Sequence, residues 1–155
     1  FIKNFFKNAF EEKSYLISRE WHYSKIKPKI LVEKLISKNI NDYKFYCTKG
    51  KPRLIQIDTD RFIKHKRNFY DFKWKPKNFE LVYEKSSKLL PKPNNLNDMI
   101  NLSSIISKNF DFCRVDLYSH ENRIYFGEIT IHPEGGVGPF ASKKMDYQFA
   151  KFLKI

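Results

Sequence analysis

The chain has 155 residues, of which 41% are hydrophobic, and it includes fifteen Phe and nine Tyr. This length and apolar content favour one globular domain with a substantial core and exclude a disordered chain. No stretch approaches 18 consecutive apolar residues and no signal peptide is visible, so we expect a cytoplasmic protein without a membrane span.

Positive charge is concentrated in the middle of the chain. The net charge is +13, and residues 44–92 hold 14 Lys or Arg against five Asp or Glu. Such a basic segment suggests an anionic partner: nucleotide phosphates, nucleic acid or an acidic polymer. Lys outnumbers Arg 24 to 6, and AT-rich codons would also explain much of that lysine, so an ordinary solvated basic face is the alternative.

Hydrophobic periodicity predicts the elements of the first part of the chain. Residues 1–12 place apolar side chains at helical spacing, and the β-branched run 29–36 favours a strand. Residues 42–48 alternate in polarity and residues 53–58 return after a Gly-containing turn, which indicates a hairpin. The charged, aromatic and proline-interrupted residues 60–92 predict a short strand or two among loops.

The second part of the chain predicts a helix and another hairpin. Asn94 or Asn95 would cap a helix that runs to about Asn109, because apolar residues recur there at helical spacing. Residues 112–119 and 124–132 alternate in polarity, and together they form the second predicted hairpin.

The two ends of the sequence look cut. Residue 1 is Phe rather than Met, and the last predicted helix, residues 143–155, stops without a capping glycine. We therefore expect a fragment of a longer protein.

The cysteines and histidines show no metal-binding spacing. Cys47 and Cys113 lie in separate strand-like runs and form no CxxC pair, so two buried, reduced thiols are expected. The four histidines show no HExxH pattern and no paired Cys/His spacing, so the sequence predicts no zinc site.

The second hairpin places its charged residues on one face. A turn centred on Asn122 sets Asp116 opposite Glu128 and Arg114 opposite Thr130, and side chains alternate along each strand. The clean partition between polar and apolar residues supports this register. The residues of the other face are apolar: Cys113, Val115, Leu117, Ile129 and Ile131.

Two carboxylates in that arrangement suggest a bound cation. Their Cβ atoms would be about 5 Å apart and would repel unless positive charge lies between them. Mg²⁺ fits, because it prefers carboxylate oxygens together with substrate phosphates. Arg114 could hold a phosphate or a developing oxyanion, and Gly135 and Gly136 would let a ligand approach the backbone. The alternative is a surface hairpin whose carboxylates pair with some of the many lysines.

The stretches RVDLY and YFGEITIHPEGG resemble the last two strands of ATP-grasp enzymes such as D-alanine–D-alanine ligase. Over roughly residues 15–150, the chain more specifically resembles the TupA-like ATP-grasp family of teichuronopeptide biosynthesis. The shared stretches are, in order, KPKILVEKLI, DYKFYCTKGKP, DRF, FYDFKW, RVDLY and FGEIT. The resemblance implies an α+β fold, the C-terminal lobe of an ATP-grasp domain, with a mostly antiparallel sheet and flanking helices. Residues 1–155 would then be a partial ATP-grasp domain that lacks the N-terminal lobe and the substrate domain.

The resemblance implies roles for the charged face of the hairpin. Asp116 and Glu128 match the family's metal-binding carboxylates. Arg114 matches the catalytic arginine that steadies the transferred phosphoryl group or the acyl intermediate. Thr130 stands where many ATP-grasp enzymes place a metal-binding Asn, so it is a candidate ligand through its hydroxyl alone.

The resemblance also implies nucleotide-binding residues. The backbone of Lys34 and Leu35 would hydrogen-bond adenine, and Glu33 would contact its amino group, unless Glu33 only forms a strand-edge salt bridge. Asp42 matches the acidic residue that binds ribose hydroxyls. Lys75 matches a phosphate-binding lysine of the family, Lys73 competes with it for that role, and plain solvent exposure is the alternative.

The implied function is ATP- and Mg²⁺-dependent activation of a carboxylate as an acyl phosphate, which an amine then attacks. The implied setting is cell-surface polysaccharide or teichuronopeptide synthesis, with an acidic polysaccharide or amino-acid substrate and no nucleic acid. One alternative is a basic nucleic-acid-binding module in which Phe69, Tyr70, Phe72 and Trp74 stack on bases. Another is a non-catalytic domain associated with a glycosyltransferase.

Overall fold

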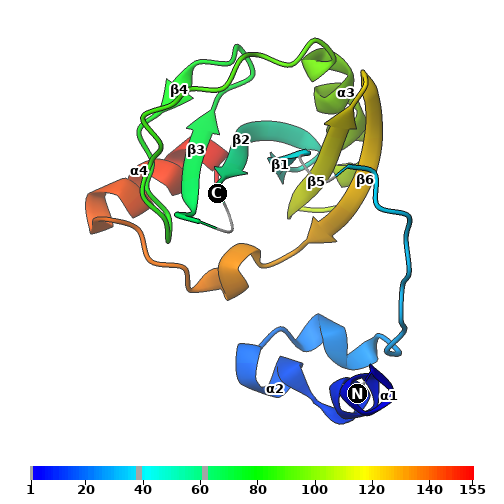
Figure 1. Ribbon diagram of the computed structural model, residues 1–155. Helices are drawn as coiled ribbons and strands as arrows, with labels where there is room; N and C mark the ends of the chain where they lie inside the picture. Colours follow the sequence, from blue (N-terminus) through cyan, green and yellow to red (C-terminus); the bar gives the residue numbers. More distant parts are fainter. Residues whose placement is uncertain (1, 38–39, 61–62) are drawn as a thin grey trace.

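The computed structural model describes residues 2–37, 40–60 and 63–155. Within them, one antiparallel sheet has six strands in the order β4-β3-β2-β1-β5-β6 (Figure 1). Helices flank this sheet, so the fold is α+β and agrees with the C-terminal lobe expected from the resemblance. The described elements are α1 (Ile2–Glu11), α2 (Ser14–Ser18), η1 (Trp21–Lys25), β1 (Asn41–Thr48), β2 (Lys51–Thr59), β3 (Lys66–Tyr70), β4 (Pro76–Lys77), α3 (Leu96–Ser107), β5 (Phe112–His120), β6 (Arg123–Thr130), η2 (Pro133–Gly136) and α4 (Lys143–Leu153).

Two tight turns build the sheet from hairpins. Lys49 and Gly50 connect β1 to β2 with φ values of 49° and 70°, and Glu121 and Asn122 connect β5 to β6 with φ values of 48° and 61°. Two consecutive residues at positive φ match the right-handed twist of the flanking strands. The two hairpins then join through β1 and β5, which lie side by side in the middle of the sheet.

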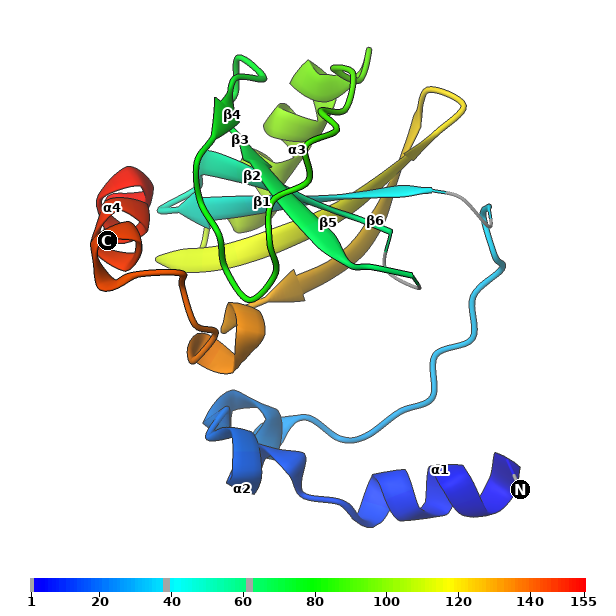
Figure 2. The ribbon, with the colours of Figure 1, turned by 60° about the vertical axis from the view of Figure 1, so that its left-hand side comes forward.

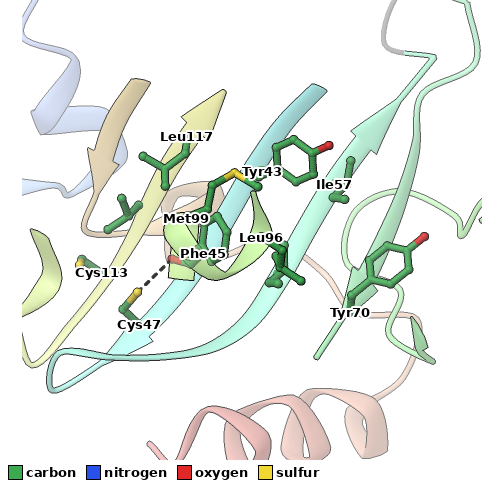
Figure 3. Close-up of a cluster of buried hydrophobic side chains, with 11 residues drawn as sticks. Tyr43, Phe45, Cys47, Ile57, Tyr70, Leu96, Met99, Cys113 and Leu117 are labelled. Carbon is green, nitrogen blue, oxygen red and sulfur yellow. Dashed lines mark hydrogen bonds between the residues drawn. The ribbon is translucent and has the colours of Figure 1, made fainter. Parts of the chain in front are cut away.

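The two faces of the sheet carry different cores. Alternate residues of β1, β2 and β5, among them Phe45, Ile57 and Val115, pack against Leu96 and Met99 of α3 (Figure 3). On the opposite face, a second apolar cluster that includes Tyr46 and Phe69 packs against α4. Away from α4, the second face carries mainly charged and polar side chains, together with Tyr118 and Tyr125. The charged and polar residues are Asp42, Lys44, Arg114, Asp116, Glu128 and Thr130.

Most predicted elements are present with small shifts at their ends. The helix at residues 1–12, both hairpins, the short strands within residues 60–92 and the last helix are all confirmed in the described residues. Asn95 is the N-cap of α3, but its side chain accepts no hydrogen bond from a helix N–H. Its amide nitrogen instead donates a hydrogen bond to Ser119 Oγ at 2.9 Å.

The strand predicted for residues 29–36 is wrong. This segment is an extended connection outside the sheet, and Leu31 and Val32 are 80% and 87% exposed. A β-branched run becomes a strand only where another strand and a core face are available to pair with it. In Figure 2, the connection passes alongside the sheet from η1 to β1 without joining it.

Both cysteines are buried, unpaired thiols, as predicted, and they face one another on β1 and β5. Burial raises the pKa of Cys47 to about 12 and that of Cys113 to about 11. Because only the thiolate reacts rapidly, the native protein should not react with a chromogenic disulfide reagent at pH 8, and both thiols should react after unfolding in denaturant. A fast reaction of either thiol in the native protein would contradict this burial.

Candidate functional site

Three neighbouring strands bring a row of charged side chains together on the sheet face that carries α4. In the strand register, Lys44 on β1 lies directly opposite Asp116 on β5, and Asp116 lies opposite Glu128 on β6. Arg114 lies opposite Thr130 two residues along. The predicted opposition of the hairpin residues is therefore confirmed.

A β-bulge produces this register. Asp116 pairs with Glu128 but Leu117 pairs with Phe126, so Gly127 is the extra residue. The turn is therefore two residues, Glu121 and Asn122, rather than one centred on Asn122. A bulge bends the strand and re-aims its side chains, and here it turns Glu128 onto the face of Asp116.

Gly127 is required at the bulge for steric reasons. A Cβ at this position would lie 2.9 Å from Tyr118 Cε2 and 3.0 Å from the backbone oxygen of Asp116. Gly127→Ala should therefore lower the free energy of unfolding by about 1–3 kcal/mol, which urea denaturation would measure. A variant as stable as the wild type would show that the hairpin tolerates another register.

Asp116 is the centre of a buried ion-pair network. Its carboxylate accepts hydrogen bonds from Arg114 Nε at 2.7 Å and Nη2 at 2.8 Å, and one from Lys44 Nζ. Lys44 also pairs with Asp42 at 2.6 Å. Arg114 Nη2 reaches Glu128 Oε1 at 3.3 Å and Thr130 Oγ1 at 3.2 Å. Burial alone would lower the pKa of Arg114, but hydrogen bonding and the charge of Asp116 outweigh it and raise that pKa.

The side chains of the row differ sharply in their exposure. Asp116 is 1% exposed and Arg114 is also buried, whereas the side chain of Glu128 is 63% exposed. Asp116 and Arg114 therefore lie inside the fold, and of these three side chains only Glu128 opens to solvent. Two protein cations, Lys44 and Arg114, neutralise Asp116, which allows its carboxylate to lie inside the fold.

A pocket of about 810 Å³ adjoins the β1 end of this row: none of the residues of the row lines it, but Asp42, the ion-pair partner of Lys44, does. Its lining includes Glu33, Lys34 and Leu35 of the extended connection and Asp42 of β1. Four of the predicted nucleotide-binding residues are thus brought together. Lys44 links the pocket to the carboxylate row, because it pairs with Asp42 on one side and with Asp116 on the other.

A family model described as TupA-like ATPgrasp matches residues 2–154. The chain belongs to the TupA-like ATP-grasp family. No curated protein and no solved structure matches it. In the described parts of this TupA-like chain, no helix is both long and apolar enough to cross a membrane.

Lys75 lies apart from the other predicted residues of this TupA-like ATP-grasp chain. It is exposed on the turn before β4, at the sheet edge opposite β6, and its backbone N–H donates to Asp71 Oδ1 at 2.9 Å. It does not line the pocket. Lys34 and Lys88 do line the pocket, so they are better placed than Lys75 to meet an anionic ligand there.

Sequence reasoning missed two parts of the site. Lys44 sits between two acidic residues only because β1 pairs with β5, a contact across 72 residues of sequence. Asp58, which also lines the pocket, is held by Arg67 through bonds of 2.7 and 3.1 Å, and Arg67 pairs with Glu134 of η2 at 2.9 Å. The order of the strands in the sheet brings these residues together, and the pattern along a single strand does not specify that order.

The segment that contains η1 lies close to the exposed end of the row. Burial raises the pKa of Tyr23, and the charges of Glu20 and Glu128 raise it further. His22 of the same segment lies against His132, two residues after β6, with ring centroids 5.1 Å apart.

Proposed function

We propose that the chain binds Mg-ATP and activates a carboxylate as an acyl phosphate for ligation to an amine, in the synthesis of cell-surface polysaccharide or teichuronopeptide. The observation that carries the proposal is the adjacency of the pocket and the carboxylate row through Lys44. Membership of the TupA-like ATP-grasp family supports it. With this activity, the protein would be a carboxylate–amine ligase.

The pocket suits the base and ribose of a nucleotide. Its volume lies within the roughly 300–1,000 Å³ of small-molecule sites, and it combines apolar side chains such as Ile36 and Leu90 with a few polar groups. The backbone of Lys34 and Leu35 would hold adenine, Glu33 would accept from its amino group, and Asp42 would accept from ribose hydroxyls. Lys34 and Lys88 supply positive charge on the wall for phosphates.

The oxygen donors beside the pocket fit Mg²⁺. Glu128 Oε1, Thr130 Oγ1 and Asp116 Oδ2 are oxygen atoms of the kind that Mg²⁺ prefers, and all three accept hydrogen bonds from Arg114 Nη2, which lies between them. The ion would therefore bind on the exposed side of Glu128 rather than at the position of that nitrogen. Glu128 is exposed and can bind a cation directly. Asp116 is already satisfied by Arg114 and Lys44, and it would contribute its charge or one oxygen.

When bound, Mg-ATP would supply the phosphoryl group that activates the substrate carboxylate for ligation to an amine. The protein contributes placement and charge. Arg114 is held rigidly by two bonds to Asp116, so its guanidinium is fixed beside the row at no further ordering cost. A preorganised cation at that place would stabilise charge that develops on the transferred group.

The nucleic-acid alternative loses its main support in the structure. Phe69 and Tyr70 are buried in the two cores, and Trp74 is half-buried and stacked on Tyr70 with ring centroids 4.5 Å apart. Among the four aromatic residues proposed to stack on bases, Phe72 alone is exposed. A stacking surface for bases needs open ring faces, which the buried rings do not offer.

Replacing Glu33 separates the two functions. Glu33→Ala should weaken Mg-ATP binding about tenfold and leave RNA binding unchanged or tighter, because loss of a negative charge cannot weaken attraction to phosphates. Nucleotide titration would measure the first effect and an RNA shift assay the second, with the exposed Glu12→Ala as a matched control outside the pocket. Unchanged ATP binding with tighter RNA binding would favour the nucleic-acid function.

A further inference from the structure

A second group of ligand-type side chains lies where the N-terminal segment meets the end of β6. Glu20 directly precedes η1, His22 lies within it, and His132 follows β6. One carboxylate oxygen and one nitrogen from each imidazole lie within 4.8 Å of one another. The two imidazole rings are tilted by 30° with centroids 5.1 Å apart. The contact between the His22 and His132 rings places η1 next to the segment that follows β6.

The chemistry of the three side chains selects the kind of metal. Two imidazoles and one carboxylate suit Zn²⁺ and related transition metals, whereas Mg²⁺ and Ca²⁺ prefer all-oxygen sites. Three protein ligands with water in the fourth position form a common tetrahedral arrangement, with metal–ligand distances of about 2.0–2.2 Å. Such a shell sets neighbouring ligand atoms about 3.4 Å apart, so small side-chain rotations would close the group around one ion.

An unsatisfied nitrogen supports this interpretation independently of the spacing. His22 Nε2 is shielded from solvent and has no hydrogen-bond partner among the described residues. A buried polar atom without a partner costs free energy, and an ion bound to this nitrogen would remove that cost. We propose that Glu20, His22 and His132 bind one Zn²⁺ ion.

The ion would link η1 to the segment that follows β6 at the edge of the sheet. His132 follows Thr130 by two residues, so the ion would hold η1 against the end of the strand that carries Glu128. Any ligand that binds only the folded arrangement stabilises it by mass action. The ligands come from both sides of the junction, so zinc should order the segment without taking part in phosphoryl transfer. The proposal does not depend on the proposed ATP chemistry.

Zinc titration of the whole chain tests the site. The protein is freed of any histidine tag and stripped with a chelator, and Zn²⁺ is then titrated in competition with a chromogenic indicator. We expect one equivalent to bind, and His22→Ala and His132→Ala should each weaken the affinity by at least about tenfold. His120→Ala is the matched control, because His120 lies outside the group beside Glu121, and it should bind zinc like the wild type.

Three further measurements test the coordination of the ion, the folding of the variants and the distinction from the magnesium site. Co²⁺ in place of Zn²⁺ should give the visible absorption of tetrahedral cobalt in the wild type and in His120→Ala, but not in His22→Ala. Circular dichroism should show the same fold in all of the zinc-free proteins. Excess Mg²⁺ should not displace zinc from the wild type. Failure to bind zinc, or equal affinity in the wild type and a correctly folded His22→Ala, would overturn the proposal.

Discussion

Asp116→Asn should lower the free energy of unfolding by about 3 kcal/mol or more, because it leaves two buried cations without their shared anion. Asp116 is nearly fully buried and pairs with both Lys44 and Arg114. From the sequence alone, the substitution relieves repulsion between two carboxylates and leaves the fold intact. The structure reverses that expectation, since the cations on either side already remove the repulsion. Urea unfolding followed by circular dichroism would measure the change.

Glu128→Gln is the matched control for this stability prediction. It removes the same charge from the opposed position on β6, but from a side chain that is 63% exposed and reaches Arg114 at 3.3 Å. An exposed pair of this kind contributes little, so the free energy of unfolding should change by less than about 1 kcal/mol. Equal stability of Asp116→Asn and the wild type would show that the buried pairs are not present in solution.

The same Glu128→Gln substitution should have the largest effect on function. In a protein that carries this lobe together with the N-terminal lobe and substrate domain that the resemblance implies, we expect Mg²⁺-dependent ATP turnover to fall at least about 100-fold while the fold is retained, because the open metal ligand would lose its charge. Turnover is measured as ADP release with a panel of amino-acid and acidic-sugar carboxylates, and hydroxylamine traps any acyl phosphate that forms. Glu121→Gln, an exposed carboxylate in the β5–β6 turn, should leave turnover unchanged. Near-normal turnover in Glu128→Gln would remove Glu128 from the metal site.

Local patterns in the sequence predicted the part of the site that lies within one hairpin. The polar and apolar residues of β5 and β6 separate cleanly, and that alternation fixes which side chains share a face even though the turn and the bulge at Gly127 were not foreseen. The helices α1, α3 and α4 were also predicted from a local pattern, because their apolar residues recur at helical spacing. The strand predicted for residues 29–36 failed because β propensity says nothing about whether a pairing partner is available.

Long-range contacts explain what the sequence could not predict. The partnership of Lys44 with Asp116 depends on β1 lying next to β5, and nothing local to either strand specifies that neighbour. The group of Glu20, His22 and His132 joins residues more than 100 positions apart, so the search for short zinc-binding spacings could not reveal it. The burial of Phe69 and Tyr70 likewise depends on which face of β3 meets which core.

The central claim is that one nucleotide occupies the pocket beside the carboxylate row with its metal at Glu128. Paramagnetic broadening by Mn²⁺-ATP in NMR spectra tests it most directly, with zinc present to fill the Glu20–His22–His132 group. We predict that Mn²⁺-ATP broadens the amide signals of residues 33–36, Asp42 and Glu128, and that the signals of residues 33–36 stay sharp without ATP. Broadening confined to the lysine-rich turn around Lys75, or none at all, would contradict the claim.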